Sequence, residues 1–302
     1  MNSSNFQSFP RLSVQAWALL RLLRPQQILK SSFVFIGLLF ARQWSDITLL
    51  GQVISAALAF SLVASGVYVL NDMLDCKYDR LHPDKRHRPL AARQVTLSAA
   101  GALLLVVWLL GFGLGLWVSV TLFMLLSLYA LINVAYSLGL KHVVILDVFL
   151  LASGFVLRIL AGTLGVGIPP SQWLLLTGTC VALFLGFAKR RAEILRLQQR
   201  SALHRRVLED YNNTMLDKAL VICASTIIMA YSLYTMSPET LYIHGSSDLI
   251  YTVPFVLYGV FRYLHLLHQG VRGGDPSSDV VADPHLLGTV ILWLLTTVWI
   301  IL

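Results

Sequence analysis

The chain has 302 residues, of which 57% are hydrophobic and only 13% are charged. This composition excludes an ordinary soluble domain, in which about 25% of residues are charged, and indicates a polytopic membrane protein. Lysine and arginine outnumber aspartate and glutamate by 23 to 15, which gives a net charge of +8. Since the sequence has no nucleic-acid-binding motif, we assign the excess of bases to a surface that meets lipid headgroups and phosphates.

Nine segments are apolar over the roughly 20 residues that a membrane span needs. The sequence therefore predicts an all-α polytopic membrane protein with about nine transmembrane helices, in a single domain over residues 1–302. The predicted spans are 31–50, 51–71, 95–117, 119–138, 144–165, 170–188, 217–236, 250–268 and 284–302. The polar segment that begins at Lys189 is predicted to extend the sixth span as a helix, because it is rich in helix-forming residues.

The basic residues predict the orientation, because Lys and Arg collect in short cytoplasmic loops. With the N-terminus inside, four bases precede the first span, six lie in 72–94 and eight lie in 189–218, whereas Arg42 is the only base in an outer loop. We therefore expect a cytoplasmic N-terminus and, after nine spans, an external C-terminus.

A block of carboxylates follows the second predicted span. Asn71, Asp72, Asp75 and Asp79 have helical spacing, so a helix that continues through them would place the three carboxylates on one face. Carboxylates at a membrane boundary are costly unless they have a function, and oxygen ligands without His or Cys favour Mg²⁺. We therefore predict that Asp72, Asp75 and Asp79 are catalytic Mg²⁺ ligands rather than a solvated helix end.

Bases follow these carboxylates in a segment bracketed by Pro83 and Pro89. Lys85, Arg86 and Arg88 are candidates to bind a substrate diphosphate beside the metal. Anchoring of a cytoplasmic loop would also supply bases at these positions. Both roles are open for each of the three residues.

A second basic cluster opens the loop after the sixth predicted span, with the sequence Lys189-Arg190-Arg191-Ala192-Glu193. On a helix, Glu193 is one turn from both Lys189 and Arg190. We name Lys189, Arg190 and Glu193 as candidate substrate-binding residues. The alternative is a basic helix that anchors the protein at the membrane surface.

Four further residues are candidate substrate contacts. Arg158 lies in an apolar helix and must face the bundle interior or a wet cavity, where it would meet a substrate anion or a partner on another helix. Asp147 is about 16 Å away along the same helix and is too far to pair with it. Lys30, Tyr136 and Lys141 lie at the inner ends of predicted spans, where they would reach a substrate or snorkel to the interface.

Three motifs resemble those of the UbiA superfamily of intramembrane prenyltransferases. The first is Asn71-Asp72-x-x-Asp75-x-x-x-Asp79 followed by His82-Pro83-x-Lys85-Arg86-x-Arg88-Pro89. The others are Arg24-Pro25-Gln26-Gln27-x-x-Lys30 and Tyr136-Ser137-x-x-x-Lys141. The resemblance covers nearly the whole chain and implies a helical bundle around a central cavity that opens at the cytoplasmic side.

Aromatic prenyltransferases of this superfamily usually carry a second aspartate-rich motif where this chain has the basic segment 189–193. The chain resembles the decaprenyl-phosphate phosphoribosyltransferase branch in this departure. It also resembles that branch in Gly154-Phe155-x-x-Arg158 and in the segment from Gly274-Asp275-Pro276 to Asp283. The resemblance implies Mg²⁺-dependent transfer of the 5-phosphoribosyl group from phosphoribosyl pyrophosphate to a polyprenyl phosphate. Because the 5-phosphate of that donor needs cations of its own, our hypothesis is that Lys189 and Arg190 bind it and that Glu193 accepts hydrogen bonds from the ribose hydroxyls.

Two other functions compete with this interpretation. One is a UbiA-type prenyltransferase that moves a prenyl chain from its diphosphate to an aromatic acceptor. The other is a transporter or lipid flippase, against which the three carboxylates beside a basic cluster argue. The branch implies a bacterial inner membrane, cell-envelope precursors and a downstream epimerase as partner. A homo-oligomer is left open.

Overall fold

The computed structural model describes residues 11–41, 43, 45–81, 85–198, 211–270 and 276–302. Every regular element in these ranges is helical. The motif residues His82, Pro83, Gly274 and Asp275 lie outside them. In chain order, the α-helices and 3-10 helices (η) are α1 (Arg11–Leu22), η1 (Pro25–Phe35), α2 (Ile36–Ala41), α3 (Ile47–Leu74), α4 (Cys76–Asp79), η2 (Lys85–His87), α5 (Leu97–Val118), α6 (Val120–Leu138), η3 (Leu140–His142), α7 (Leu146–Ala161), η4 (Leu164–Val166), α8 (Gln172–Gln198), α9 (Asn213–Met236), α10 (Pro238–His244), η6 (Asp248–Thr252), α11 (Val253–His268), α12 (Pro276–Ala282) and α13 (Pro284–Ile301).

Within the described residues, eight helices are long and apolar enough to cross a membrane, and they correspond to eight of the nine predicted spans. The first predicted span, 31–50, is divided instead. It contains the end of η1, all of α2 and the start of α3. Asp46 explains the division, because its side chain accepts hydrogen bonds from the backbone N–H groups of Thr48 and Leu49 and so caps the start of α3.

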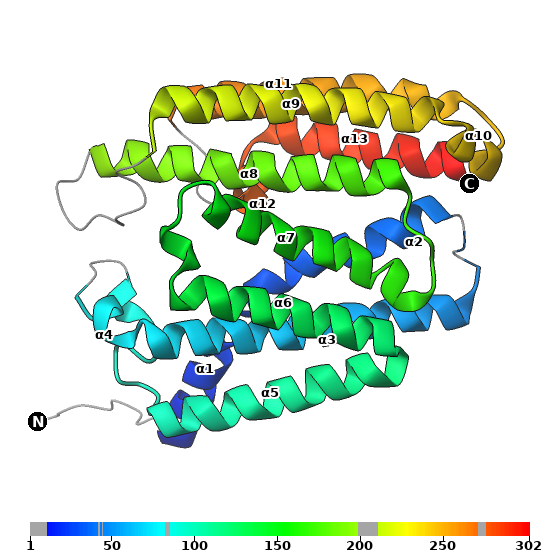
Figure 1. The fold of residues 1–302 in the computed structure, drawn as a ribbon. Coiled ribbons are helices and arrows are strands. Elements are labelled where there is room, and N and C mark those ends of the chain that lie inside the picture. Colours follow the sequence, from blue (N-terminus) through cyan, green and yellow to red (C-terminus); the bar gives the residue numbers. More distant parts are fainter. Residues whose placement is uncertain (1–10, 42, 44, 82–84, 199–210, 271–275) are drawn as a thin grey trace, which may run out of the picture.

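The long helices run along a common direction (Figure 1). Helix α3 packs against α5 and α6, α7 packs against α8, α8 packs against α9, and α11 packs against α13. The connection between α6 and α7, the carboxyl end of α8 and the start of α9 lie at the same end of the bundle as α4, at the left in Figure 1. We call this the α4 end. Helix α8 continues through residues 189–193 to Gln198, as predicted.

Four buried apolar clusters lie within the described part of the bundle, and the two largest form its centre. One includes Phe60 of α3 and Leu126 of α6, and the other includes Phe184 of α8 and Leu220 of α9. Helix α7 contributes to both clusters and so joins the two parts of the bundle. At its carboxyl end, a Cβ atom on Gly162 would lie 1.7 Å from the carbonyl oxygen of Val34 in η1. Only glycine allows the two backbones to approach this closely.

Candidate active site

The three motif carboxylates lie at the α4 end, where the prediction of one continuous helix is wrong at Asp75. Helix α3 ends at Leu74, Asp75 adopts φ −87° and ψ 0°, and α4 begins at the next residue. The chain keeps a helical course, because the Asp79 N–H donates to the Asp75 carbonyl at 2.9 Å. Asp72 and Asp79 consequently face a common point, while Asp75 faces η3.

The common point is occupied by the guanidinium of Arg88. Its Nη1 lies 2.9 Å from Oδ1 of Asp72 and 2.8 Å from Oδ2 of Asp79, and the two carboxylate side chains are only 3% and 5% exposed. The motif residue Arg88 is therefore brought to the carboxylates, as predicted for a base beside them. Two buried carboxylates that share one positive group are a strongly cation-attracting pair.

Arg24 is a site residue that was not predicted. Its Nη2 lies 2.6 Å from the same Oδ1 of Asp72, and its guanidinium lies over the Tyr68 ring, 5.0 Å from the centroid. Arg24 has φ 53° and ψ 61° immediately before Pro25, a conformation that is rare for an arginine and unfavourable before proline. The Arg24-Pro25 pair in its motif could have marked Arg24 as a site residue. No local pattern indicated its contact with Asp72, which lies 48 positions away.

The carboxyl end of α6 and the following η3 cover the other side of this carboxylate cluster. Lys141 Nζ lies 3.1 Å from Oδ1 of Asp75, and the Ser137 hydroxyl donates to the amide oxygen of Asn71 at 3.2 Å. The structure thus brings together Asn71, Asp75 and Lys141, which were each predicted as site residues.

A second polar cluster surrounds Arg190 on α8. Its Nε forms an ion pair of 2.6 Å with Oδ2 of Asp147, its Nη1 donates to Glu193 at 2.5 Å and its Nη2 donates to the Tyr136 hydroxyl at 3.3 Å. The Arg190 and Asp147 side chains are 1% and 0% exposed, whereas Glu193 is 27% exposed. In this arrangement Arg190 contacts protein groups on every nitrogen, and Glu193 is its most accessible charged partner.

Tyr211, just before α9, completes this cluster. Its hydroxyl donates to Oδ1 of Asp147 at 2.6 Å and accepts the backbone N–H of Ile145 at 2.7 Å. Burial raises the pKa of Tyr211, and its hydrogen bond to the Asp147 carboxylate raises that pKa further. Neither Asp147 nor Tyr211 was predicted as a site residue. Asp147 is more than 40 positions from Arg190 and more than 40 positions from Tyr211 in the chain, so no local pattern indicated either contact.

The two polar clusters meet at the end of α6. Tyr136 contacts Arg190 of the second cluster, and the next residue, Ser137, contacts Asn71 of the first. Consecutive helical residues point about 100° apart, so the clusters flank α6 on two adjacent faces at the same end of the bundle. A substrate with two phosphate-bearing ends could contact both.

The remaining predicted bases occupy different surroundings. Arg86 is exposed, and its Nε donates to His87 at 3.3 Å rather than to a carboxylate. Lys30 lies in η1, Lys85 in η2, and Lys189 precedes Arg190 on α8. Direct contact of these residues with a substrate stays a prediction.

Arg158 is not brought to the carboxylate cluster. Its guanidinium donates to the Gly154 carbonyl at 2.7 Å and lies near three aromatic rings, with centroids at 4.7 Å for Phe60, 5.2 Å for Tyr129 and 5.7 Å for Phe155. Phe60 precedes Asp72 by 12 residues, or about 18 Å along α3. Arg158 therefore faces the bundle interior, as predicted, but its observed partners join α3, α6 and α7.

The residues of the late motif segment also join helices. Oδ2 of Asp283 lies 2.8 Å from Nη2 of Arg262 on α11, while Oδ1 accepts the N–H of Leu286 and caps α13. The hydrogen bonds from Arg262 lower the pKa of Asp283 to about 2. This contact fixes α11 to α13.

The donor groups of the carboxylate cluster suit Mg²⁺, although their observed arrangement does not form a metal site. Three carboxylates and the Asn71 amide supply the hard oxygen ligands that Mg²⁺ prefers, and Arg88 already places a positive charge where Asp72 and Asp79 converge. Among the described residues, no three His, Cys, Asp or Glu side chains are arranged as a metal site. The chemistry of these groups therefore suits Mg²⁺, whereas in the structure the carboxylates are paired with Arg24, Arg88 and Lys141.

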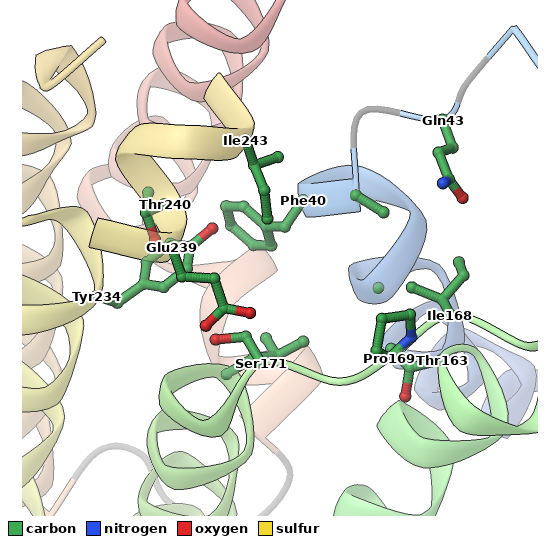
Figure 2. A pocket seen from close by; sticks show the side chains of 13 residues that line it. Phe40, Gln43, Thr163, Ile168, Pro169, Ser171, Tyr234, Glu239, Thr240 and Ile243 are labelled. Carbon is green, nitrogen blue, oxygen red and sulfur yellow. The ribbon is translucent and has the colours of Figure 1, made fainter. Parts of the chain in front are cut away.

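A separate cavity of about 210 Å³ lies at the opposite end of the bundle, between α2, the start of α8 and α10. Ser171, just before α8, and Glu239 and Thr240, of α10, line it together with Tyr234 (Figure 2). No motif residue lines this cavity, and it is remote from the two polar clusters.

Comparison with known proteins identifies the family. A model of the UbiA prenyltransferase family matches residues 31–279. The decaprenyl-phosphate phosphoribosyltransferases of Mycolicibacterium smegmatis and Corynebacterium glutamicum are 30% and 31% identical to the chain. Both matches cover 91% of this chain, with 90% and 84% of the relatives. A UbiA homologue from Archaeoglobus fulgidus, solved bound to DMAPP and Mg²⁺, superposes with a TM-score of 0.70 at 16% identity, over 94% of this chain and 98% of that one. The chain belongs to the UbiA prenyltransferase family.

Proposed function

We propose that the protein transfers the 5-phosphoribosyl group of phosphoribosyl pyrophosphate to a polyprenyl phosphate and releases diphosphate. The observation that carries this proposal is the unlike chemistry of the two polar clusters. One cluster has three carboxylates, Asp72, Asp75 and Asp79, whereas the other is built around Arg190 with Glu193 as its partly exposed acid. The relatives named decaprenyl-phosphate phosphoribosyltransferase support the same activity.

The carboxylate cluster is assigned to the leaving diphosphate. Asp72, Asp75 and Asp79 would hold Mg²⁺, which when bound neutralises charge on the departing group. Arg24, Arg88 and Lys141 lie within 3.1 Å of these carboxylates. Guanidinium and ammonium groups form charge-assisted hydrogen bonds with phosphate oxygens. We therefore assign these three bases to the diphosphate, with Lys85 and Arg86 at its periphery and Asn71 orienting the cluster.

The acceptor needs positioning more than activation. An oxygen of the lipid phosphate is already anionic, so it can form the new bond to the anomeric carbon of ribose while the bond from that carbon to the diphosphate oxygen breaks. No proton has to be removed, and we assign no general base. Holding the two anions in a cationic site supplies the proximity on which the rate depends. Lys30, in η1, is our candidate for the acceptor phosphate.

The second cluster is assigned to the remainder of the donor. Lys189 is our candidate for the 5-phosphate, and Glu193 for the ribose hydroxyls, beside Tyr136. Arg190 is buried against Asp147, so we assign it a supporting rather than a direct role. Arg158, which is surrounded by aromatic rings, would contact a substrate only along the lipid chain in the bundle interior.

Replacing Glu193 with Gln is expected to raise the KM for the phosphoribosyl donor about tenfold, because a hydrogen bond to a charged group contributes roughly 1.5–3 kcal/mol. The KM for the polyprenyl phosphate should stay unchanged, since Glu193 is assigned to the donor alone. Steady-state rates at varied donor and acceptor concentrations measure both constants. An unchanged donor KM would count against the assignment.

The transfer itself is tested with purified protein, radiolabelled phosphoribosyl pyrophosphate and a polyprenyl phosphate, with Mg²⁺ or with a chelator. We expect label in the organic phase with Mg²⁺ and a loss of at least tenfold with chelator, which restoring Mg²⁺ reverses. No label with confirmed substrates, together with activity on a prenyl diphosphate and an aromatic acceptor, would favour prenyl transfer instead.

We further propose that the α4 end faces the cytoplasm of a bacterial inner membrane, where the donor is soluble. The bases concentrated in segments 72–94 and 189–218 support this orientation. The C-terminus lies at the opposite end of the bundle (Figure 1), so η1 and α2 together would add a ninth crossing to those of the eight spanning helices. An enzyme that epimerises the lipid-linked ribose to arabinose would use the product for cell-envelope precursors.

A further inference from the structure

We propose that Asp147 and Tyr211 are positioning residues, which orient Glu193 toward the donor through the buried Arg190. This inference rests on the proposed function and deepens it. Neither residue belongs to a motif recognised in the sequence, and both are linked to Glu193 through Arg190.

The burial of Arg190 costs free energy that its partners must offset. A guanidinium removed from water is strongly destabilising unless an opposite charge and further hydrogen bonds compensate it. The fully buried Asp147 supplies that charge at 2.6 Å from Nε. Glu193 is not required to be buried for this purpose and keeps 27% of its side chain exposed. The two acids that contact Arg190 therefore differ in role. Asp147 neutralises the buried charge, whereas Glu193 keeps part of its side chain accessible to the donor.

The guanidinium transmits orientation because it is planar and its nitrogens have fixed relative directions. Asp147 holds the Nε side of the group as an ion pair without hydrogen-bond geometry, and Nη1, in the same rigid plane, donates to Glu193 at 2.5 Å. Nη2 lies 3.3 Å from the Tyr136 hydroxyl. A change in the Asp147 contact would rotate the guanidinium and displace the Glu193 carboxylate.

Tyr211 in turn fixes Asp147. It donates to Oδ1 of Asp147, leaving Oδ2 for Arg190, and it accepts the N–H of Ile145. Ile145 has φ 69°, which is strained for a β-branched residue. Through this hydrogen bond, the Tyr211 hydroxyl stabilises the strained turn at the start of α7, next to which Asp147 contacts Arg190 of α8. Backbone strain of this kind persists only where surrounding contacts stabilise it.

The matching pair on the other face of α8 provides a control. Arg191 Nε lies 2.5 Å from Oδ1 of Asp217 on α9. This pair also joins α8 to a neighbouring element but contacts none of the residues assigned to the donor. Asp217→Asn therefore removes the ion pair of the adjacent arginine, whose carboxylate is more exposed than that of Asp147, without affecting Glu193.

The test measures donor and acceptor KM for Tyr211→Phe, Asp147→Asn and Asp217→Asn, alone and combined with Glu193→Gln. We expect Tyr211→Phe and Asp147→Asn to raise the donor KM about tenfold and leave the acceptor KM unchanged. In the Glu193→Gln background, each should change the donor KM less than twofold, because residues that act through one group are not additive. Asp217→Asn should leave the donor KM unchanged.

Two results would overturn the inference: an unchanged donor KM in Tyr211→Phe, or a full tenfold effect that persists in the Glu193→Gln background. If Asp147→Asn fails to fold, Tyr211→Phe carries the same comparison, since it removes only a hydroxyl. Failure of the proposed function is distinct, because the unaltered protein would then show no phosphoribosyl transfer, and the inference would fall with it.

Discussion

Replacing Asp72 with Asn is expected to lower the transfer rate by about 10²- to 10³-fold, the scale for removing one preorganised electrostatic group from an active site. Asp72 is the carboxylate on which two arginines converge, Arg24 at 2.6 Å and Arg88 at 2.9 Å. Asn has nearly the same shape, so the change removes charge rather than volume. The initial rate at saturating donor and acceptor measures the effect.

Two comparisons make this result specific to the carboxylate cluster. The Asp72→Asn protein should need more Mg²⁺ for half-maximal rate, because one proposed ligand has lost its charge. Asp217→Asn should keep close to the original rate, since Asp217 pairs with Arg191 outside the site. An Asp72→Asn protein that retains a third or more of the original rate would exclude Asp72 from the chemistry.

Replacing Gly162 with Ala is expected to destabilise the fold by about 3 kcal/mol, at the upper end of the usual cost of overpacking. The added Cβ would lie 1.7 Å from the backbone oxygen of Val34, and a backbone atom cannot move away by rotation of a side chain. Either η1 or the end of α7 must shift. The thermal unfolding midpoint in detergent should fall by several degrees.

The matched control is Gly113→Ala in α5. A Cβ there would meet no atom within 4 Å, and alanine favours a helix by about 1 kcal/mol over glycine. Its unfolding midpoint should stay the same or rise. If both variants had the same midpoint as the original protein, the close crossing of η1 and α7 would not contribute to stability.

Local sequence patterns predicted the elements that depend on local physics. Long apolar runs predicted the spanning helices, and the spacing of Asp72, Asp75 and Asp79 predicted carboxylates gathered near one helix end. The break at Asp75 was missed because the helical spacing continues through it. The division of 31–50 was missed as well, although the capping residue Asp46 lies inside that range.

The contacts of Arg24, Asp147 and Tyr211 could not be predicted, because each pairs with a residue far away in the chain. Hydropathy places Asp147 at the start of a span but does not say which cation faces it. Arg158 is another residue whose contacts could not be predicted from the sequence. Its burial was predictable from its apolar neighbours, whereas its aromatic surroundings depend on how α3 and α6 pack against α7.

A doubly labelled donor shows most directly which bond breaks in the proposed transfer. Phosphoribosyl pyrophosphate would carry ¹⁴C in ribose and ³²P in the terminal phosphate of its diphosphate, and would be incubated with the protein, Mg²⁺ and a polyprenyl phosphate. The account predicts ¹⁴C in the organic phase and ³²P in the aqueous phase as diphosphate, in equal molar amounts. Both labels remaining in the aqueous phase, with substrates and folded protein confirmed, would contradict it.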